Sequence, residues 1–228
     1  MIINIDKSVG REYYIDVIMC IDTTESMATF INELKSYVKK FYQKVLLYMT
    51  EKEKNLQHLR AKVITFGNCS NNNYNAIVES PFYVWGDGRD NQTDEFYSYV
   101  DAIESCGCGA HSSSLDALAF AFKTNWCKGR GNNCYIMMFT NSIANPLGSI
   151  DRSLHSEEMP KSFKELQDVW ESLEIQLNAK RLIVYAPDCE PWTDMENWIN
   201  VYHDSYLFDA EFPEIEIETC MRICFGDC

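Results

Sequence analysis

Apolar runs of strand length alternate with amphipathic segments of helical length along this chain. The runs lie at 13–21, 61–66, 135–140 and 181–185, and a shorter one is predicted at 205–208. Strands that alternate with helices are typical of a mostly parallel sheet covered by helices on both faces. The pattern therefore predicts a three-layer α/β fold.

The longest predicted helix begins directly after the first strand. Its apolar positions run from Met27 to Met49 at a spacing of three to four residues, while Lys35, Lys39 and Lys44 lie on the other side. This spacing is that of one buried helix face. Shorter helices are predicted at 93–105, 115–126, 163–177, 192–201 and 214–225.

The segment 76–85 predicts the return strand of a hairpin after a polar turn at 67–75. It contains Pro81, which has no N–H to donate to a neighbouring strand, and proline in a sheet is confined to edges and bulges. We therefore expect one antiparallel edge strand in an otherwise mostly parallel sheet.

Length and composition favour one domain spanning residues 1–228, because no linker-like stretch divides the chain. The 34 acidic and 20 basic residues give a net charge of −14. This charge argues against binding nucleic acid or an anionic membrane, which both need a basic surface. No signal peptide is recognised at the amino terminus and no apolar run approaches the roughly 20 residues of a membrane span, so we expect a cytoplasmic protein.

Ten cysteines are present, and reduced thiols are expected in a cytoplasmic chain. Cys20 and Cys134 fall inside predicted strands, where a thiol packs as a small hydrophobe. Cys106 and Cys108, with His111, resemble half of a zinc site without its second ligand pair. Three further cysteines recur every four residues along one face of the last predicted helix, at Cys220, Cys224 and Cys228. For both clusters, ordinary packing is the simpler explanation.

The segment Asp22-Thr23-Thr24-Glu25-Ser26 stands where the first strand ends. Asp22, Thr24 and Ser26 place a carboxylate and two hydroxyls on one turn, and such hard oxygen ligands suit Mg²⁺, Mn²⁺ or Ca²⁺. Ligands of open parallel sheets bind at the carboxyl ends of the strands. The motif therefore predicts a divalent-cation site there.

Two further oxygen-rich loops are expected at the same edge of the sheet. His111-Ser112-Ser113-Ser114 opens a predicted helix, and Thr140-Asn141-Ser142 follows a predicted strand. Together the three loops resemble the metal-ion-dependent adhesion site (MIDAS) of von Willebrand factor A (vWA) domains. The resemblance is strongest to the small bacterial cytoplasmic (TerY-like) members, through segments at 78–82, 114–118, 123–126, 145–147, 159–163 and 185–192.

The resemblance implies a Rossmann-like vWA fold and a role for each matching residue. Asp22 would accept hydrogen bonds from metal-bound water, and the hydroxyls of Thr24 and Ser26 would ligate the ion. Ser112 takes the place of the second-loop ligand, and Asn141 takes the place of an aspartate that the family usually has. Asp22 is then the site's only carboxylate, so weaker Mg²⁺ binding is expected.

Local helix capping is an alternative explanation of the first two loops, because Asp, Thr and Ser side chains commonly accept hydrogen bonds from the first N–H groups of a helix. The functional hypothesis is a metal-dependent protein–protein interaction module, in which an acidic residue of a protein partner completes the coordination of the ion. The alternative is a degenerate, metal-free scaffold that binds partners through the 141–160 loop or the C-terminal helix. Catalysis by Cys108 and His111 is a third possibility, and we expect no enzyme activity.

Overall fold

The computed structural model describes residues 12–68, 77–86, 90–105, 111–127, 132–148, 159–173, 179–206 and 217–225. The strands are β1 (Glu12–Asp22), β2 (Asn55–Phe66), β3 (Ile77–Glu79), β4 (Tyr83–Gly86), β5 (Asp90–Asn91), β6 (His111–Ser112), β7 (Asn132–Phe139), β8 (Ile143–Ala144), β9 (Ala179–Pro187) and β10 (Val201–Tyr206). The helices are α1 (Ile31–Glu51), α2 (Thr93–Asp101), α3 (Ser114–Lys123), α4 (Phe163–Ser172) and α5 (Ile217–Phe225), with 3₁₀ helices η1 (Glu25–Met27) and η4 (Thr193–Asn197).

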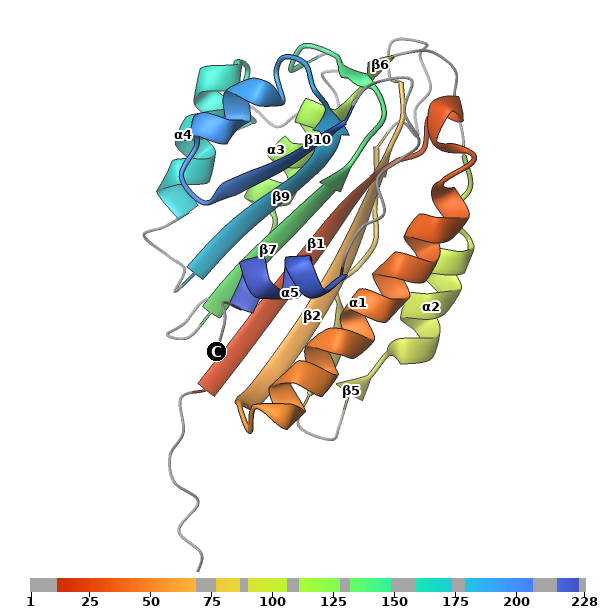
Figure 1. The fold of residues 1–228 in the computed structure, drawn as a ribbon, viewed down its shortest axis with the longest axis vertical. Coiled ribbons are helices and arrows are strands. Elements are labelled where there is room, and N and C mark those ends of the chain that lie inside the picture. Colours follow the sequence, from red (N-terminus) through yellow and green to blue (C-terminus); the bar gives the residue numbers. More distant parts are fainter. Residues whose placement is uncertain are drawn as a thin grey trace, which may run out of the picture.

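The main sheet has the strand order β10-β9-β7-β1-β2-β4-β5, and β3 also pairs with β2 (Figure 1). The five strands from β10 to β2 are mutually parallel. Strands β3 and β4 run antiparallel to β2, and β5 runs antiparallel to β4. This arrangement confirms the mostly parallel sheet with an antiparallel edge.

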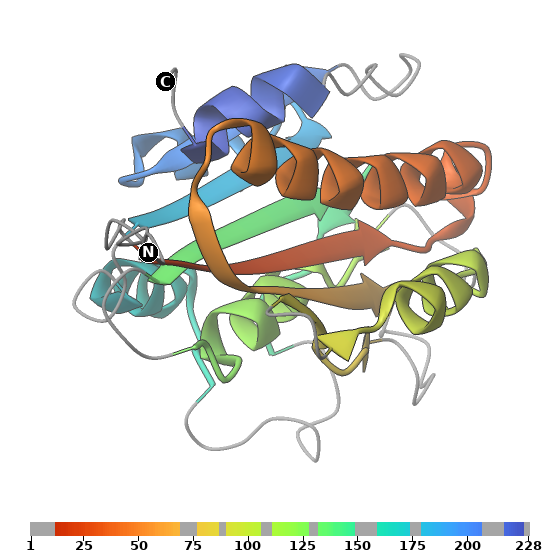
Figure 2. The ribbon, with the colours of Figure 1, turned by 90° about the horizontal axis from the view of Figure 1, so that it is seen from below.

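Both faces of the sheet are covered by apolar side chains, and successive residues of a strand belong alternately to two apolar clusters. In β1, Val17, Met19 and Ile21 belong to one cluster, and Ile18 and Cys20 belong to the other. Successive side chains of a strand point to opposite faces, so a continuous apolar run is what a doubly covered strand requires. The edge-on view in Figure 2 shows α1 and α5 on one face and α3 and α4 on the other. The predicted three layers are confirmed.

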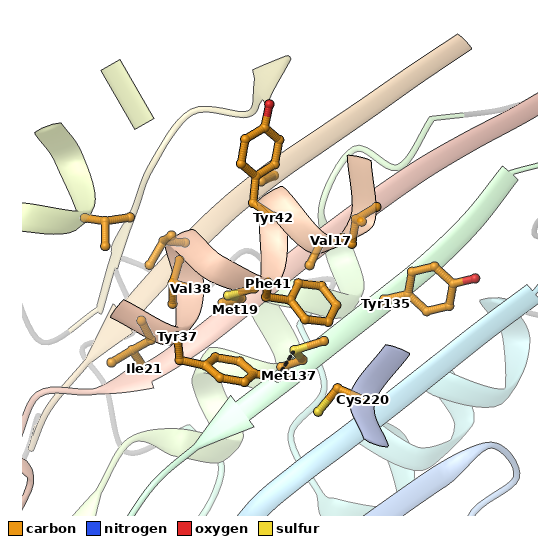
Figure 3. Packing of buried hydrophobic residues seen from close by; sticks show 14 of the residues in the cluster. Val17, Met19, Ile21, Tyr37, Val38, Phe41, Tyr42, Tyr135, Met137 and Cys220 are labelled. Carbon is orange, nitrogen blue, oxygen red and sulfur yellow. Dashed lines mark hydrogen bonds between the residues drawn. The ribbon is translucent and has the colours of Figure 1, made fainter. Parts of the chain in front are cut away.

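The first cluster lies under α1, whose apolar stripe packs on the sheet. Tyr37, Phe41 and Val45 are buried along it, as the three-to-four spacing predicts. Figure 3 shows Tyr37 and Phe41 above β1 and β7, with the Tyr37 hydroxyl 3.8 Å from the sulfur of Met137. The second cluster is built around Trp170 of α4, whose ring centroid lies 5.1 Å from that of Phe122.

The antiparallel edge is broken into pieces at Pro81, so the predicted continuous strand 76–85 is corrected to β3 and β4. Ser80 bridges the break on the β2 side. Its N–H donates to the carbonyl of Val63 at 2.9 Å, and its hydroxyl accepts the Val63 N–H at 2.9 Å. A side chain thus replaces one backbone acceptor where the proline interrupts the ladder.

Several predicted boundaries differ from the observed ones. The helix after Asp22 begins at Ile31, because the intervening residues form η1 and a turn. The helix expected at 192–201 is only the 3₁₀ turn η4, and β10 begins at Val201 instead of Ser205 because it pairs with Leu182 of β9. Helix α2 ends at Asp101 rather than at residue 105.

None of the helices in the described ranges is both long and apolar enough to cross a membrane.

Candidate metal site

The first and third predicted loops leave the sheet side by side. Strands β1 and β7 are paired neighbours, with Ile21 opposite Phe139, so Asp22 and Thr140 emerge together at the carboxyl edge. The second loop includes β6, which pairs with β8 of the third loop. Its carbonyl at Ser112 accepts the N–H of Asn145 at 2.8 Å. The topology therefore collects all three loops at one edge, where open parallel sheets bind ligands.

Asp22 is fully buried and has two hydrogen bonds that hold its carboxylate in place. Oδ1 accepts the Thr24 N–H at 2.8 Å, and Oδ2 accepts the hydroxyl of Thr140 at 2.6 Å. The second bond joins the last residue of β1 to the residue that follows β7, so the carboxylate ties the first loop to the third. Asp22 therefore lies between the first and third predicted loops and is hydrogen-bonded to both.

A cluster of three hydroxyls lies beside this carboxylate. Thr24 Oγ1 is 3.0 Å from Ser26 Oγ and 3.1 Å from Ser142 Oγ, and the two serine oxygens are 3.5 Å apart. Thr24 and Ser26 were predicted members. Ser142 was not assigned a role in the sequence analysis, although it lies next to Asn141. Thr140 and Ser142 belong to the predicted third loop, but no signal in the sequence indicated the individual role of either residue.

The remaining predicted ligands have polar atoms without protein partners. Ser112 Oγ and Asn141 Oδ1 are buried and make no hydrogen bond within the described residues, and the same holds for Ser114 Oγ, which was not a predicted ligand. Buried polar atoms are nearly always paired, and an unpaired one calls for an explanation such as a missing ion or water. Unpaired hard oxygens in loops two and three fit the donors that a divalent cation requires. Neither Ser112 Oγ nor Asn141 Oδ1 is within hydrogen-bond distance of the hydroxyls of Thr24, Ser26 and Ser142.

Helix capping does not account for these hydroxyls. The N-cap residue of α3 is Ser113, and its side chain makes no capping hydrogen bond. Thr24 precedes η1 and likewise makes no side-chain cap. By contrast, Ser162 at the start of α4 accepts the Glu165 N–H in the ordinary way at 3.1 Å. The alternative explanation of the first two loops is therefore weakened.

Burial raises the pKa of Asp22, and the hydrogen bonds from Thr140 and Thr24 oppose that rise without cancelling it. A buried carboxylate without a cation beside it is costly. An ion at the site would favour the charged form and supply the missing compensation.

The raised pKa predicts how metal-free stability depends on pH. The folded protein holds the Asp22 proton more tightly than the unfolded chain does. The contribution of Asp22 to the free energy of unfolding therefore falls as pH rises from the ordinary pKa of the carboxyl through the raised pKa. Asp22→Asn should lack this fall and be the more stable form above that range. Urea unfolding in chelator at several pH values measures the difference, and a parallel pH profile for the two proteins would contradict the prediction.

The cysteine-containing alternatives receive no support from the described residues. Cys106, Cys108 and Cys228 lie outside them, and His111 is exposed. Burial raises the pKa of Cys20, Cys134, Cys220 and Cys224, as expected of thiols that pack as hydrophobes. Within the ranges that the structure covers, no three His, Cys, Asp or Glu side chains gather as a metal site. A cation site here therefore depends on hydroxyl and amide oxygens around one carboxylate.

No protein-family model matches this chain, and no curated protein matches its sequence. Proximal thread matrix protein 1 from the mussel byssus is similar in structure, with a TM-score of 0.50 and 11% sequence identity over 94% of this chain. A second structure of that protein, with a zinc-occupied MIDAS motif, matches with a TM-score of 0.48 and 10% identity over 88% of this chain. This chain spans 48% and 43% of the length of those two chains. The first likeness agrees with the Rossmann-like α/β fold.

Proposed function

We propose that this chain is a vWA-type protein-interaction module that binds its partner through a divalent cation. One observation carries the proposal: oxygen-bearing side chains of the first and third loops lie together. The Thr24 hydroxyl is within hydrogen-bond distance of Ser26 and Ser142, and Asp22 accepts hydrogen bonds from the Thr24 N–H and from Thr140. Unpaired buried oxygens of Ser112 and Asn141 in the adjoining segments support it.

Each residue has a distinct task in this proposal. The hydroxyls of Thr24, Ser26 and Ser142 form the cluster that would face the ion, and Thr140 holds the Asp22 carboxylate in orientation. Asn141 and Ser112 would supply the oxygens that now lack partners. Mg²⁺, Mn²⁺ and Ca²⁺ are the ions that such oxygen ligands select.

The ion, when bound, supplies a Lewis-acidic position for an acidic residue of the partner. Among the residues that the structure describes, Asp22 is the only carboxylate in the cluster, so a divalent cation held by these residues would keep a net positive charge. A foreign carboxylate is therefore attracted more strongly than to a site with two protein carboxylates.

Titration of Mg²⁺, Mn²⁺ and Ca²⁺ into the reduced protein by isothermal calorimetry tests the proposal. Saturable binding is expected for wild type and no detectable binding for Asp22→Ala. The matched control is Asp101→Ala, which removes an exposed carboxylate at the end of α2, outside the cluster. Equal binding by wild type and Asp22→Ala would overturn the assignment of the site.

A metal-free scaffold remains the second candidate, because the hydroxyls already satisfy one another. Thr24 bridges Ser26 and Ser142, so the cluster is hydrogen-bonded without an ion. Partner binding would then use the 141–160 loop, of which residues 149–158 lie outside the described residues, or the C-terminal helix α5. Partner capture that is unchanged by chelator and by Asp22→Ala would favour this candidate.

A further inference from the structure

An open pocket of about 430 Å³ lies beside the candidate metal site. Its wall includes Ala144 and Asn145, which follow Ser142 of the hydroxyl cluster in the same loop. It also includes Leu115, the residue after Ser114. The pocket and the metal site therefore share the third loop, and Ile143, which lies between Ser142 and Ala144, is partly exposed.

The wall shared with the metal site is held in place by hydrogen bonds. The Asn145 N–H donates to the carbonyl of Ser112, and the Gly148 N–H donates to the buried Asp116 carboxylate at 2.9 Å. Gly148 has a φ of +78°, which a glycine adopts without strain. The turn that forms the wall is thus fixed before anything enters the pocket.

The lining combines apolar surface with uncompensated acidic groups. Its apolar side chains are Leu115, Pro146, Leu147, Phe163 and Pro191. Glu190 and Asp194 line it as well and are exposed, with no ion pair to either one within the described residues. Lys161 is the one basic residue of the lining. Two carboxylates against one ammonium, in a chain of net charge −14, favour a basic occupant.

We propose that this pocket is a second recognition site for the same protein partner, and that it takes an apolar side chain adjoining a lysine or arginine. The apolar side chain would fill the pocket while the cationic group pairs with Glu190 and Asp194. This inference rests on the proposed function, because the same partner segment presents its acidic residue to the metal site.

The length of the shared loop limits the spacing of these partner residues. Leu147 follows Ser142 by five positions, so their Cα atoms are at most ~18 Å apart. An extended partner segment covers that distance in about five residues. The acidic residue and the apolar–basic pair are therefore expected within one short linear segment.

Selection of a random linear peptide library against the immobilised full chain tests the inference, in Mg²⁺ and in chelator. The wild-type pool in Mg²⁺ should be enriched in an acidic residue and, within about five positions, an apolar residue next to Lys or Arg. A selected peptide should bind Glu190→Lys/Asp194→Lys roughly fivefold or more weakly, because two charge pairs are reversed. Peptides selected against the double variant should no longer be enriched in Lys or Arg but should still be enriched in an acidic residue.

Glu12→Lys/Glu51→Lys is the matched control, since it changes the net charge equally at exposed positions where β1 begins and α1 ends. Its pool and affinities should equal those of wild type. An acidic preference without an apolar–basic pair, or a pair preference that survives reversal at Glu190 and Asp194, would overturn this inference alone. A pool without any metal-dependent acidic preference would overturn the proposed function and this inference with it.

Discussion

Replacing Asn141 with aspartate is expected to tighten divalent-cation binding at least about tenfold, or about 1.4 kcal/mol. The change adds a second carboxylate at a position where the Asn141 Oδ1 atom is already buried without a hydrogen-bond partner. Mg²⁺ depends on carboxylates to offset its dehydration. The added charge also lies one residue from Thr140, which donates to Asp22, so metal-free stability should fall through repulsion. Calorimetric titration and chelator-treated unfolding measure the two effects.

Asn55→Asp is the matched control for Asn141→Asp. It makes the same chemical change at an exposed position where β2 begins, at the opposite end of that strand from the site. Its metal affinity should equal that of wild type. If Asn141→Asp binds no more tightly than this control, Asn141 does not face the ion.

Replacing Arg60 with alanine is expected to destabilise the fold by about 3 kcal/mol, in the lower range for breaking a buried ion pair. Arg60 Nε and Nη2 donate to the two oxygens of Asp16 at 2.7 and 2.6 Å, and Asp16 is only 2% exposed. A loss at the lower end of that range is expected because Asp16 also accepts a hydrogen bond from the Cys127 N–H at 2.8 Å, which the substitution leaves in place. Arg60 also lies 4.2 Å from the ring centroid of Phe82, and that contact is lost as well. Urea unfolding measures the difference.

Lys164→Ala is the control for this prediction. Lys164 pairs with Asp168 at 2.9 Å on the exposed face of α4, and pairs of this kind contribute about 0.5 kcal/mol or less. A second test is Arg60→Met combined with Asp16→Asn, which removes both charges and should be less damaging than Arg60→Ala alone. Equal losses for Arg60→Ala and Lys164→Ala would show that burial of Asp16 does not govern the effect.

Most of the fold follows from the periodicity of the sequence. The run from Tyr13 to Ile21 predicts a buried strand because every position except Asp16 is apolar or aromatic, and the stripe from Met27 to Met49 predicts α1. Boundaries were less accurate where a neighbouring strand decides them. Val201 belongs to β10 rather than to a helix because β9 offers it a partner at Leu182, and no local pattern announces that pairing.

The candidate site was predicted in part, for a similar reason. Asp22, Thr24 and Ser26 lie within five consecutive residues, so the sequence displays them as one motif. Asn141 was assigned because it stands where the resemblance places an aspartate of the family, and Ser142, the next residue, was given no role. Which of them meets Thr24 depends on how the loop leaves the strand. The structure places the Ser142 hydroxyl 3.1 Å from Thr24, across 118 positions of sequence.

The sequence by itself determined most of the alternation of strands and helices, the apolar faces and the oxygen-rich motif at the end of β1. Each of these is a property of nearby residues, and the local chain geometry converts it directly into structure. Only the tertiary structure decided that Thr140 orients Asp22, that Arg60 neutralises Asp16 and that a pocket with acidic residues on its wall adjoins the metal site. These features join segments 44 or more positions apart or several loops at once, and the register between paired strands sets their distances.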